Sequence, residues 1–583
     1  MYGDAVSHMH ECGCVSGPVH FCRCAPVGIL WELPTLGVRA VRRGFETPDS
    51  RMDVLAVLTE PARLILALFW SLLSWPSRQL SWVRSQYIPP PIPTKRLANG
   101  LLADVQMPAT VTEAIEIAKT LGFPAWFAVG AATAAYQVEG GLDKSNWAEW
   151  ERSGRNGSHF AGTACDMWNR FDADVKRMRA LGLRMYRFSV DWSRLEPSEG
   201  FFDDKALAEY VRWCVLLREA GIEPMITLHH FAEPAWFEAK GGFIHRANIE
   251  FFTRFAERAV AALAPHCRHW CTVNELNGVV ICGYLAGIHP PGIKDDLPKV
   301  LHAIRHLMLA HGRAASIIRR ITAELPLRGL APAPSPIVVL PLSHIMFMPA
   351  GLGLISYLLP ALLNYLFNFA FHEAAIKGRL SLIVHALFWL FGHRGLHADV
   401  QTLRGSVDVV GVNHYYRSEV SFGLEPKGTP GEAPRRSGPT DLFLRLPGGM
   451  LLRATPVDGF EKSDMNWDLT PSSMEWLLTA LWERFHMPMI VTESGIADGD
   501  EPDDRRTRYL AAVLRVASRV RERGVDLRGY LIWTLLDNFE WAEGFRPRFG
   551  LLRTNFTDLA RHERLSSPMV RGVFSRDEHG RPL

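Results

Sequence analysis

The stretch "HWCTVNE", residues 269–275, is an apolar run that ends on an amide and a carboxylate. Its β-branched and aromatic residues favour a β-strand. Burying the carboxylate of Glu275 at the end of such a strand costs free energy unless the charge has a partner or a task. The stretch therefore predicts a buried strand that delivers Asn274 and Glu275 to a place where they are used.

Similar apolar segments recur along the chain. The eight predicted strands are residues 125–132, 184–190, 223–230, 269–275, 336–344, 407–415, 488–494 and 530–538. Between them lie segments such as "FDADVKRMRALG" and "FFTRFAERAVAALAPH", whose apolar residues recur at helical spacing. Eight apolar strands that alternate with helices predict a (β/α)8 TIM barrel, an α/β fold, for residues 106–583.

Almost every predicted strand ends in polar or ionisable residues. In a barrel of this kind the carboxyl ends of the strands meet at one mouth, where catalysis takes place. We therefore expect these side chains to gather at that mouth. They are Arg187, His229, His230, Asn274, Glu275, His344, Asn413, Tyr415, Glu493, Asp537, Asn538, Glu540 and Trp541.

The composition is that of a globular protein that buries a large core. The chain has 583 residues, of which 48% are hydrophobic and 21% charged, and its net charge of +3 is too near neutral to indicate nucleic-acid binding. No set of His and carboxylate residues has metal-ligand spacing, and no glycine-rich phosphate loop is evident, so we predict no metal and no cofactor. The five Cys residues from Cys165 to Cys282 are interpreted as buried free thiols.

Two of the strand ends carry carboxylates in similar settings, "VNEL" (273–276) and "TESG" (492–495). Each Glu alone could be a structural ion-pair partner. A facing pair of carboxylates, however, is the apparatus of glycoside hydrolysis, in which one protonates the leaving oxygen and the other attacks the anomeric carbon or activates water. The neighbouring amide, imidazole and aromatic side chains suit a sugar, which needs hydrogen bonds for its hydroxyls and an aromatic floor.

At this point the sequence resembles a known family. The motifs "AYQVEGG", "YRFSVDWSRLEP", "TLHHF", "TVNE", "GVNHYY", "IVTESG" and "WTLLDNFEWAEGFRPRFGL" are similar to the successive signatures of glycoside hydrolase family 1, from residue 123 to about residue 560. The resemblance implies a retaining β-glycosidase that cleaves terminal glucoside- or galactoside-type O-glycosides through a covalent glycosyl-enzyme. It implies that Glu275 is the acid/base and that Glu493 is the nucleophile.

The resemblance also implies roles for the other residues of the mouth. Arg187 and Tyr415 match residues that hold the nucleophile, and Asn413 matches one that helps to orient it. Acting as an acid near neutral pH requires a raised pKa for Glu275, which burial and the charge of Glu493 would supply. A carboxylate at 540 would repel a phosphorylated sugar. The residues that match the sugar-gripping subsite are Gln137, His230, Asn274, Trp533, Glu540 and Trp541.

The sequence departs from the family pattern at several places, of which two bear most on the site. Leu276 stands where the family has proline after the acid/base, which lifts a restriction on the backbone of Glu275. Residues 329–371 contain no Asp, Glu, Lys or Arg, and within them we place an apolar insertion at about 337–371. The insertion is interpreted either as a strand and a helix packed on the barrel or as an apolar lip that contacts a membrane or a lipid aglycone.

A narrower resemblance concerns a plant branch of the family that transfers galactose between galactolipids. The motifs "VDWSR" (190–194) and "SHIMFMP" (343–349) are similar to that branch. They imply an alternative function, a membrane-associated transglycosylase acting on glycolipids. The partner is then a carbohydrate or a glycolipid, with peripheral membrane contact through residues 52–85 and 337–371.

The first 105 residues read as an extension of the barrel. Residues 1–51 form a Cys-rich leader, in which Cys12, Cys14, Cys22 and Cys24 indicate either a metal site or a disordered and even untranslated segment, because Met52 resembles a natural start. Residues 52–105 contain a short apolar run, either an interfacial anchor or a helix packed on the main domain, and the Pro-rich linker 87–96. No secretory signal is evident, so we expect a cytoplasmic protein, with or without membrane association.

Overall fold

The computed structural model describes residues 106–331, 334–350, 354–424, 442–446, 450–455 and 460–577, together with 579 and 581. The predictions made for residues 1–51 and 52–105 fall outside these residues. They include the cysteine cluster, the apolar run and the Pro-rich linker.

Eight parallel strands close into a barrel, as the sequence predicts. Each strand pairs with its neighbour in the ring, and the pairings of β5 with β6 and of β1 with β10 complete the closure. All eight predicted strands are present. They are β1 (Ala128–Ala132), β2 (Met185–Ser189), β3 (Glu223–His229), β4 (His269–Val273), β5 (Ile337–Pro349), β6 (Val409–Leu424), β9 (Met489–Ser494) and β10 (Leu527–Trp533).

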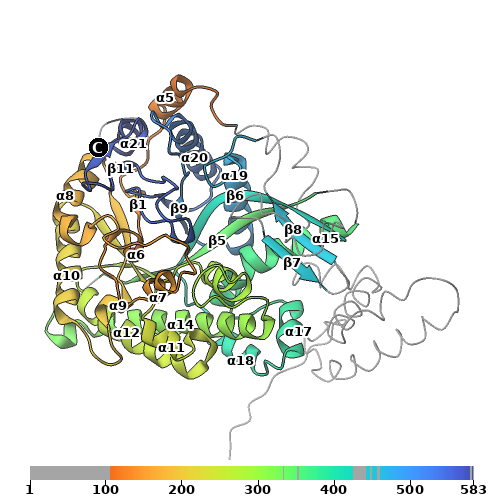
Figure 1. The fold of residues 1–583 in the computed structure, drawn as a ribbon. Helices are drawn as coiled ribbons and strands as arrows, with labels where there is room; N and C mark the ends of the chain where they lie inside the picture. Colours follow the sequence, from red (N-terminus) through yellow and green to blue (C-terminus); the bar gives the residue numbers. More distant parts are fainter. Residues whose placement is uncertain are drawn as a thin grey trace, which may run out of the picture. The chain divides into compact units, whose positions relative to one another are not determined.

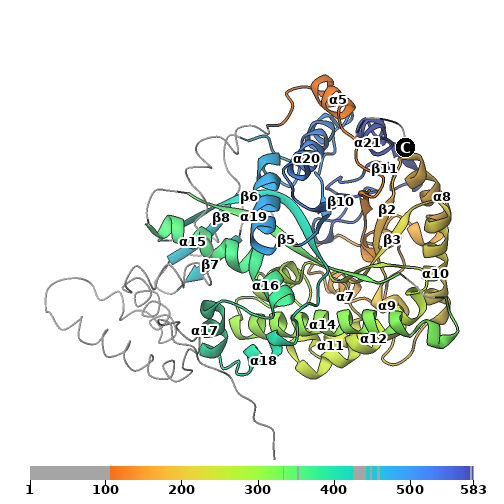
Figure 2. The ribbon, with the colours of Figure 1, turned by 180° about the vertical axis from the view of Figure 1, so that it is seen from behind.

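Amphipathic helices surround the strands (Figure 1, and from behind in Figure 2). In α12 the buried residues Phe252, Phe255, Ala259 and Leu263 recur every three or four positions and form one apolar face. The longer helices are α8 (Met167–Ala180), α10 (Asp204–Glu219), α12 (Ile249–Leu263), α14 (Leu297–Glu324), α15 (Leu354–Asn364), α19 (Pro471–Phe485) and α20 (Asp504–Glu522).

Shorter elements connect these layers. The short α-helices are α5 (Val111–Lys119), α6 (Ala135–Val138), α7 (Asn146–Arg152), α9 (Trp192–Leu195), α11 (Ala235–Ala239), α13 (Leu276–Val280), α16 (Ala370–Lys377), α17 (Leu382–Leu390), α18 (Leu396–Gln401) and α21 (Ser566–Phe574). The 3-10 turns are η2 (Gly242–Ile244), η3 (Arg246–Asn248), η5 (Pro326–Arg328) and η7 (Trp541–Glu543). Two π-helical turns are η4 (Ile281–Leu285) and η6 (Tyr365–Phe369), and β11 (Leu552–Thr554) pairs with β12 (Arg561–Glu563).

The inside of the barrel is filled by side chains and is not a channel. One layer takes apolar residues from seven strands: Met185, Met225, Cys271, Val339, Val409, Ile490 and Leu531. Side chains on one face of a strand recur every second residue, so the next inward positions are Arg187, Thr227, Thr492 and Trp533. The apolar layer is thus followed directly by a layer that contains Arg187, Thr227 and Thr492. This second layer lies beneath the site and positions it.

Strands β5 and β6 run beyond the predicted limits of 344 and 415. They stay paired as far as Pro349 and Val420, outside the barrel ring. Strand β8 (Met450–Thr455) adds to β6, and β7 (Leu442–Leu446) adds to β8, both antiparallel (Figure 1). The region predicted as an apolar insertion is therefore a strand followed by α15, η6 and the start of α16. Helix α15 packs its Leu359 and Leu363 against Phe347 and Val420 of these strands. In the described part of the chain, no helix is long and apolar enough to cross a membrane.

The expectation that His344 lies at the barrel mouth is wrong. Strand β5 continues past it, and the imidazole packs on the outer face of the strand against His372 of α16, with ring centroids 5.4 Å apart. Burial lowers the pKa of His344 to about 3 and that of the neighbouring His414 to about 4, and it holds the pKa of His372 well below its usual value. These imidazoles are therefore neutral in the folded protein.

This histidine cluster predicts a pH dependence of stability. Between the unfolded pKa of about 6.5 and the folded pKa, the unfolded chain binds more protons, so the contribution of His344 to stability is lost as pH falls through this window. We expect His344→Leu to gain roughly 1–3 kcal/mol of unfolding free energy relative to the parent chain between pH 7 and pH 4.5, by urea titration. Parallel pH profiles for His344→Leu and the parent chain would contradict the prediction.

Candidate active site

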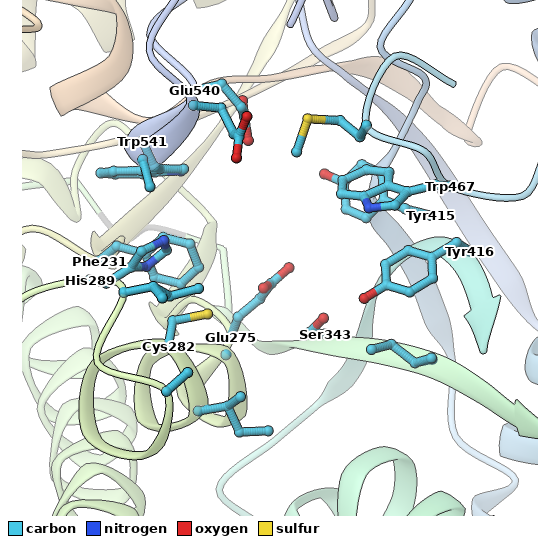
Figure 3. A pocket seen from close by; sticks show the side chains of 18 of the residues that line it. Phe231, Glu275, Cys282, His289, Ser343, Tyr415, Tyr416, Trp467, Glu540 and Trp541 are labelled. Atoms are coloured by element: carbon cyan, nitrogen blue, oxygen red, sulfur yellow. The ribbon is translucent and has the colours of Figure 1, made fainter. Parts of the chain in front are cut away.

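A cavity of about 400 Å³ opens at the carboxyl ends of the barrel strands. Figure 3 shows Glu275 projecting into it from one side and Glu540 from another, with aromatic side chains around them. Glu493 lines the same cavity. The two strand-end carboxylates that the sequence singled out, 275 and 493, therefore share one space.

Glu493, at the end of β9, is held by two donors. The Arg187 guanidinium donates to its Oε1 at 2.6 Å, and the Tyr415 hydroxyl donates to its Oε2 at 2.8 Å. Arg187 is fully buried, and its other nitrogens donate to the Thr227 hydroxyl at 3.0 Å and to the Asn274 side-chain oxygen at 2.6 Å. Both carboxylate oxygens are thus fixed in direction, one by a buried guanidinium and the other by a partly buried hydroxyl.

Glu275 lies one residue after Asn274, which follows β4, and directly precedes α13. Its backbone N–H donates to the Pro341 carbonyl at 2.9 Å, and the side-chain amide of Asn413 donates to its Oε1 at 2.7 Å. A Cβ on Gly278 would lie 2.9 Å from the other carboxylate oxygen, so glycine leaves the space that this oxygen needs. Leu276 is fully buried. The direction of Glu275 is therefore set by packing and hydrogen bonds, without the proline of the family pattern.

The backbone is strained where it lines the cavity. Phe231, Glu275 and Trp541 are non-glycine residues with φ of 65°, 45° and 49°. This left-handed region costs a residue with a side chain about 1–3 kcal/mol, and such residues cluster at functional sites. At position 495 glycine is required by lack of space, because a Cβ would lie 1.8 Å from the Trp533 carbonyl oxygen.

Burial raises the pKa of both carboxyl groups, but their partners differ. For Glu275, burial and then the negative charge of Glu493 raise the pKa, and the Asn413 hydrogen bond opposes them only in part. For Glu493, burial raises the pKa, while the Arg187 charge and the Tyr415 hydrogen bond lower it. The guanidinium favours charge on Glu493, so Glu275 is the member of the pair that keeps a proton.

Polar groups on the far side of Glu493 form a second network. Gln137 donates to the Phe539 carbonyl at 2.8 Å and to Glu540 at 3.2 Å, and the Asn274 amide lies 3.1 Å from His230 Nε2. Burial and the nearby charge of Glu493 raise the pKa of Glu540 to about 8. The buried Gln137 Oε1 and His230 Nδ1 have no hydrogen-bond partner, which is costly unless a ligand supplies one.

All eleven site residues predicted from the sequence gather in this region. Those that line the cavity are His230, Glu275, Tyr415, Glu493, Trp533, Glu540 and Trp541. The others hydrogen-bond to them from behind: Gln137, Arg187, Asn274 and Asn413. The hydrogen bond of Asn413 at 2.7 Å goes to Glu275, although its backbone aligns with Glu493 in the sheet.

Several cavity residues were not singled out from the sequence. Phe231, Cys282, His289, Tyr416 and Trp467 surround the cavity in Figure 3. Tyr416 directly follows a predicted residue, and its ring stacks on Trp467 at 5.1 Å. Cys282 was expected to be a buried thiol. It is half-buried on the cavity wall, whereas Cys165, Cys214, Cys267 and Cys271 are buried free thiols as predicted.

Among the described residues, no group of three or more His, Cys, Asp and Glu side chains could hold a metal ion. The comparisons with known proteins concern the same region of the chain as the site. A family model described as glycosyl hydrolase family 1 matches residues 119–578. The chain belongs to glycosyl hydrolase family 1. The predicted family and the enzyme class, a glycoside hydrolase, are thereby confirmed.

Individual members of glycosyl hydrolase family 1 are similar over most of the chain. Beta-glucosidase A of Acetivibrio thermocellus is 31% identical over 467 residues, which cover 75% of this chain and 95% of that protein. Thermostable beta-glucosidase B of Thermobispora bispora is 32% identical over 83% of this chain and 98% of that protein. The solved family 1 β-glucosidase from Thermotoga maritima gives a TM-score of 0.68 at 26% identity, over 78% of this chain and 98% of that one.

The coupling between the two carboxyls gives a direct test. Glu493→Gln removes the negative charge that is the second largest cause of the raised pKa of Glu275, so that pKa should fall. The pKa can be followed by the carboxyl signal of selectively labelled glutamate in NMR. Glu540→Gln removes a group that raises the pKa of Glu275 less than Glu493 does, so it should lower that pKa less. An unchanged pKa in Glu493→Gln would show that the two groups are not coupled.

Proposed function

We propose that this chain hydrolyses terminal β-glycosides by the retaining mechanism, with Glu493 as the nucleophile and Glu275 as the acid/base. The observation that carries the assignment of roles is the asymmetry of the pair. Glu493 lies against a buried guanidinium that favours its charged form, and Glu275 lacks such a partner and keeps a proton. A nucleophile must be ionised and a general acid must be protonated. A charged Glu493 and a protonated Glu275 meet these two requirements.

In the first step Glu493 attacks the anomeric carbon and forms a glycosyl ester. The glycosidic bond breaks, and its oxygen leaves with the proton of Glu275. The ester no longer carries the charge of Glu493, so the pKa of Glu275 falls. In the second step Glu275 takes a proton from water, the water oxygen bonds to the anomeric carbon, and Glu493 leaves as a carboxylate. The sugar keeps its β configuration.

The network around Glu540 supports recognition of an unphosphorylated sugar. Its carboxylate, with Gln137 and the unpartnered nitrogen of His230, offers acceptors and a donor to hydroxyl groups, and Trp533 and Trp541 supply aromatic faces. The relatives include β-glucosidases and also a 6-phospho-β-galactosidase of Streptococcus mutans, 28% identical. A phosphate would add another negative charge beside Glu493 and Glu540, where the charge of Glu493 already raises the pKa of Glu540, so we assign a neutral glucoside or galactoside.

A glycolipid transglycosylase is the second candidate. It uses the same glycosyl-enzyme, with a sugar hydroxyl in place of water. The observation that favours it is that Ile345 and Phe347, within the motif shared with the plant branch, line the cavity. Oligoglycosyl lipids formed from glycolipid vesicles would identify this activity, and free sugar as the sole product would exclude it. Peripheral membrane contact through residues 52–85 and 337–371, the separate domains at 1–51 and 52–105 and a cytoplasmic location stay predictions.

The roles of the two carboxylates are separable by azide rescue. Glu493→Ala should abolish hydrolysis of an aryl β-glucoside, by at least about 10⁴-fold, and azide should restore turnover with formation of the α-glycosyl azide. Glu275→Ala is the matched control. It should still form the glycosyl-enzyme from a 2,4-dinitrophenyl glycoside, whose leaving group needs no acid, and azide should then give the β-glycosyl azide. Full activity of Glu493→Ala, or the same azide anomer from both variants, would contradict the assignment.

Substitution of Gly278 should affect substrates differently, according to whether their leaving group needs an acid. A methyl group at this position would lie 2.9 Å from a carboxylate oxygen of Glu275 and displace it. Because misplacement of a catalytic group by about 1 Å can cost 100-fold, Gly278→Ala should lower kcat roughly 10- to 100-fold for a methyl glycoside. The 2,4-dinitrophenyl glycoside should be affected far less in its first step. An equal loss for both substrates, measured by burst kinetics, would mean that Gly278 serves folding alone.

A further inference from the structure

The cavity continues past Glu275 and away from the sugar-gripping residues. There it runs between two walls: η4 and the turn after it on one side, and the extended part of the β5–β6–β8 sheet with η6 on the other. Figure 3 shows Cys282 and His289 on one side of Glu275 and Tyr416 and Trp467 on the other. The apolar residues of these walls are Ile281, Leu285, Ile288, Ile345, Phe347, Phe367 and Ala454, and Lys294, Asp295, Ser343 and Ser418 also line the cavity.

The sheet wall exists because β5 leaves the barrel as a strand. Ser343, Ile345 and Phe347 alternate along it and all three line the cavity, whereas His344 and Met346 lie between them and are buried outside the cavity. Beyond the barrel, β5 pairs with β6 on one side only, so the backbone groups of 343, 345 and 347 point to its open edge.

Three asparagine side chains form hydrogen bonds with the backbone N–H and C=O groups of this open edge. We call them the asparagine ladder: Asn277, Asn364 and Asn368. Asn277 exchanges two hydrogen bonds with the backbone of Ser343, at 2.7 and 3.2 Å. Asn368 does the same for Ile345, at 2.8 and 3.0 Å, and Asn364 for Phe347, at 2.8 and 3.1 Å.

The ladder fixes the apolar wall to the catalytic loop. Asn277 lies two residues after Glu275, and its amide also donates to the Phe367 carbonyl at 3.2 Å. Asn364 and Asn368 are one helical turn apart at the end of α15 and in η6, which brings Phe367 to the cavity. The position of Ile345, Phe347 and Phe367 relative to Glu275 is therefore held by buried amides, not by loop packing.

We propose that this second part of the cavity binds an apolar aglycone, such as an alkyl chain of about eight carbons or a terpenoid ring system, which places the glycosidic oxygen at Glu275. This rests on the proposed function, since the leaving group must lie on this side of the acid/base. A sugar aglycone presents several hydroxyls, and against Ile345, Phe347 and Phe367 each of them would lose its hydrogen bonds to water. An apolar aglycone gains instead by burial.

The test compares aglycones on one sugar. For methyl, butyl, hexyl and octyl β-glucosides, kcat/KM should rise about threefold for each added methylene until the cavity is filled. Octyl β-glucoside should exceed cellobiose by at least about 100-fold. β-Glucosyl fluoride, which has no organic aglycone, separates the two ideas. If the fluoride is not hydrolysed, the proposed function fails. If the fluoride is hydrolysed and cellobiose equals or exceeds the octyl glucoside, only the aglycone proposal fails.

Variants locate the effect on the wall. Ile345→Asn and Phe367→Ser should each lower kcat/KM for octyl β-glucoside at least about 10-fold and leave β-glucosyl fluoride within about twofold. Leu382→Asn, on the exposed face of α17, is the matched control and should change neither substrate. Asn368→Leu removes both hydrogen bonds to Ile345 and should raise KM for the octyl glucoside without changing the fluoride. Equal losses on both substrates in the wall variants would overturn the proposal.

A third experiment distinguishes a membrane lipid from a free apolar glucoside as the substrate. One sample holds a β-glucosyl lipid in phosphatidylcholine vesicles. The other holds octyl β-glucoside in solution, below its critical micelle concentration. Faster cleavage in vesicles indicates a membrane lipid, and faster cleavage in solution indicates a free apolar glucoside. Failure to cleave either, with the fluoride still hydrolysed, would overturn the apolar aglycone.

Discussion

The site depends on one buried cation, the guanidinium of Arg187. It extends from β2 and bonds to the end of β9 at Glu493, to Thr227 on β3 and to Asn274 after β4, so one side chain ties four strands together. A cation taken out of water is costly unless carboxylate and hydrogen-bond partners surround it. Here one partner is Glu493, the proposed nucleophile, and the others are Thr227 and Asn274. The geometry that makes the buried charge tolerable is the same geometry that orients the carboxylate of Glu493 and leaves Glu275 as the protonated member of the pair.

Glu275, the proposed acid/base, shows that different local contacts can hold the same residue in place. The family pattern restrains the backbone before the helix with a proline, and this chain has Leu276 there. In its place, a fully buried leucine, the hydrogen bond to the Pro341 carbonyl and the Asn413 amide fix Glu275, and Gly278 leaves room for its carboxylate. The left-handed φ of 45° at Glu275 is kept by these tertiary contacts, which no local sequence rule describes.

How far the sequence predicts the molecule differs between the barrel and its extension. The eight strands and the two carboxylates follow from local composition, because a buried parallel strand is an apolar run and a charge at its end is conspicuous. The sequence did not predict that β5 and β6 continue beyond 344 and 415, because the residues that satisfy them lie on separate elements. For the same reason His344 was placed at the mouth. Whether a strand ends at a polar residue depends on the partner across from it, here His372 on α16.

The asparagine ladder has a consequence apart from ligand binding. A strand that leaves a barrel normally offers a row of free N–H and C=O groups, which another chain can extend into intermolecular sheet. Along β5 from Ser343 to Phe347 those groups are already paired with the amides of Asn277, Asn368 and Asn364. The chain can thus carry a long, apolar, one-sided strand without making it a template for aggregation. Loss of any one of these amides would free the backbone N–H and C=O groups of one residue of β5. The three asparagines therefore oppose aggregation as well as hold the shape of the wall.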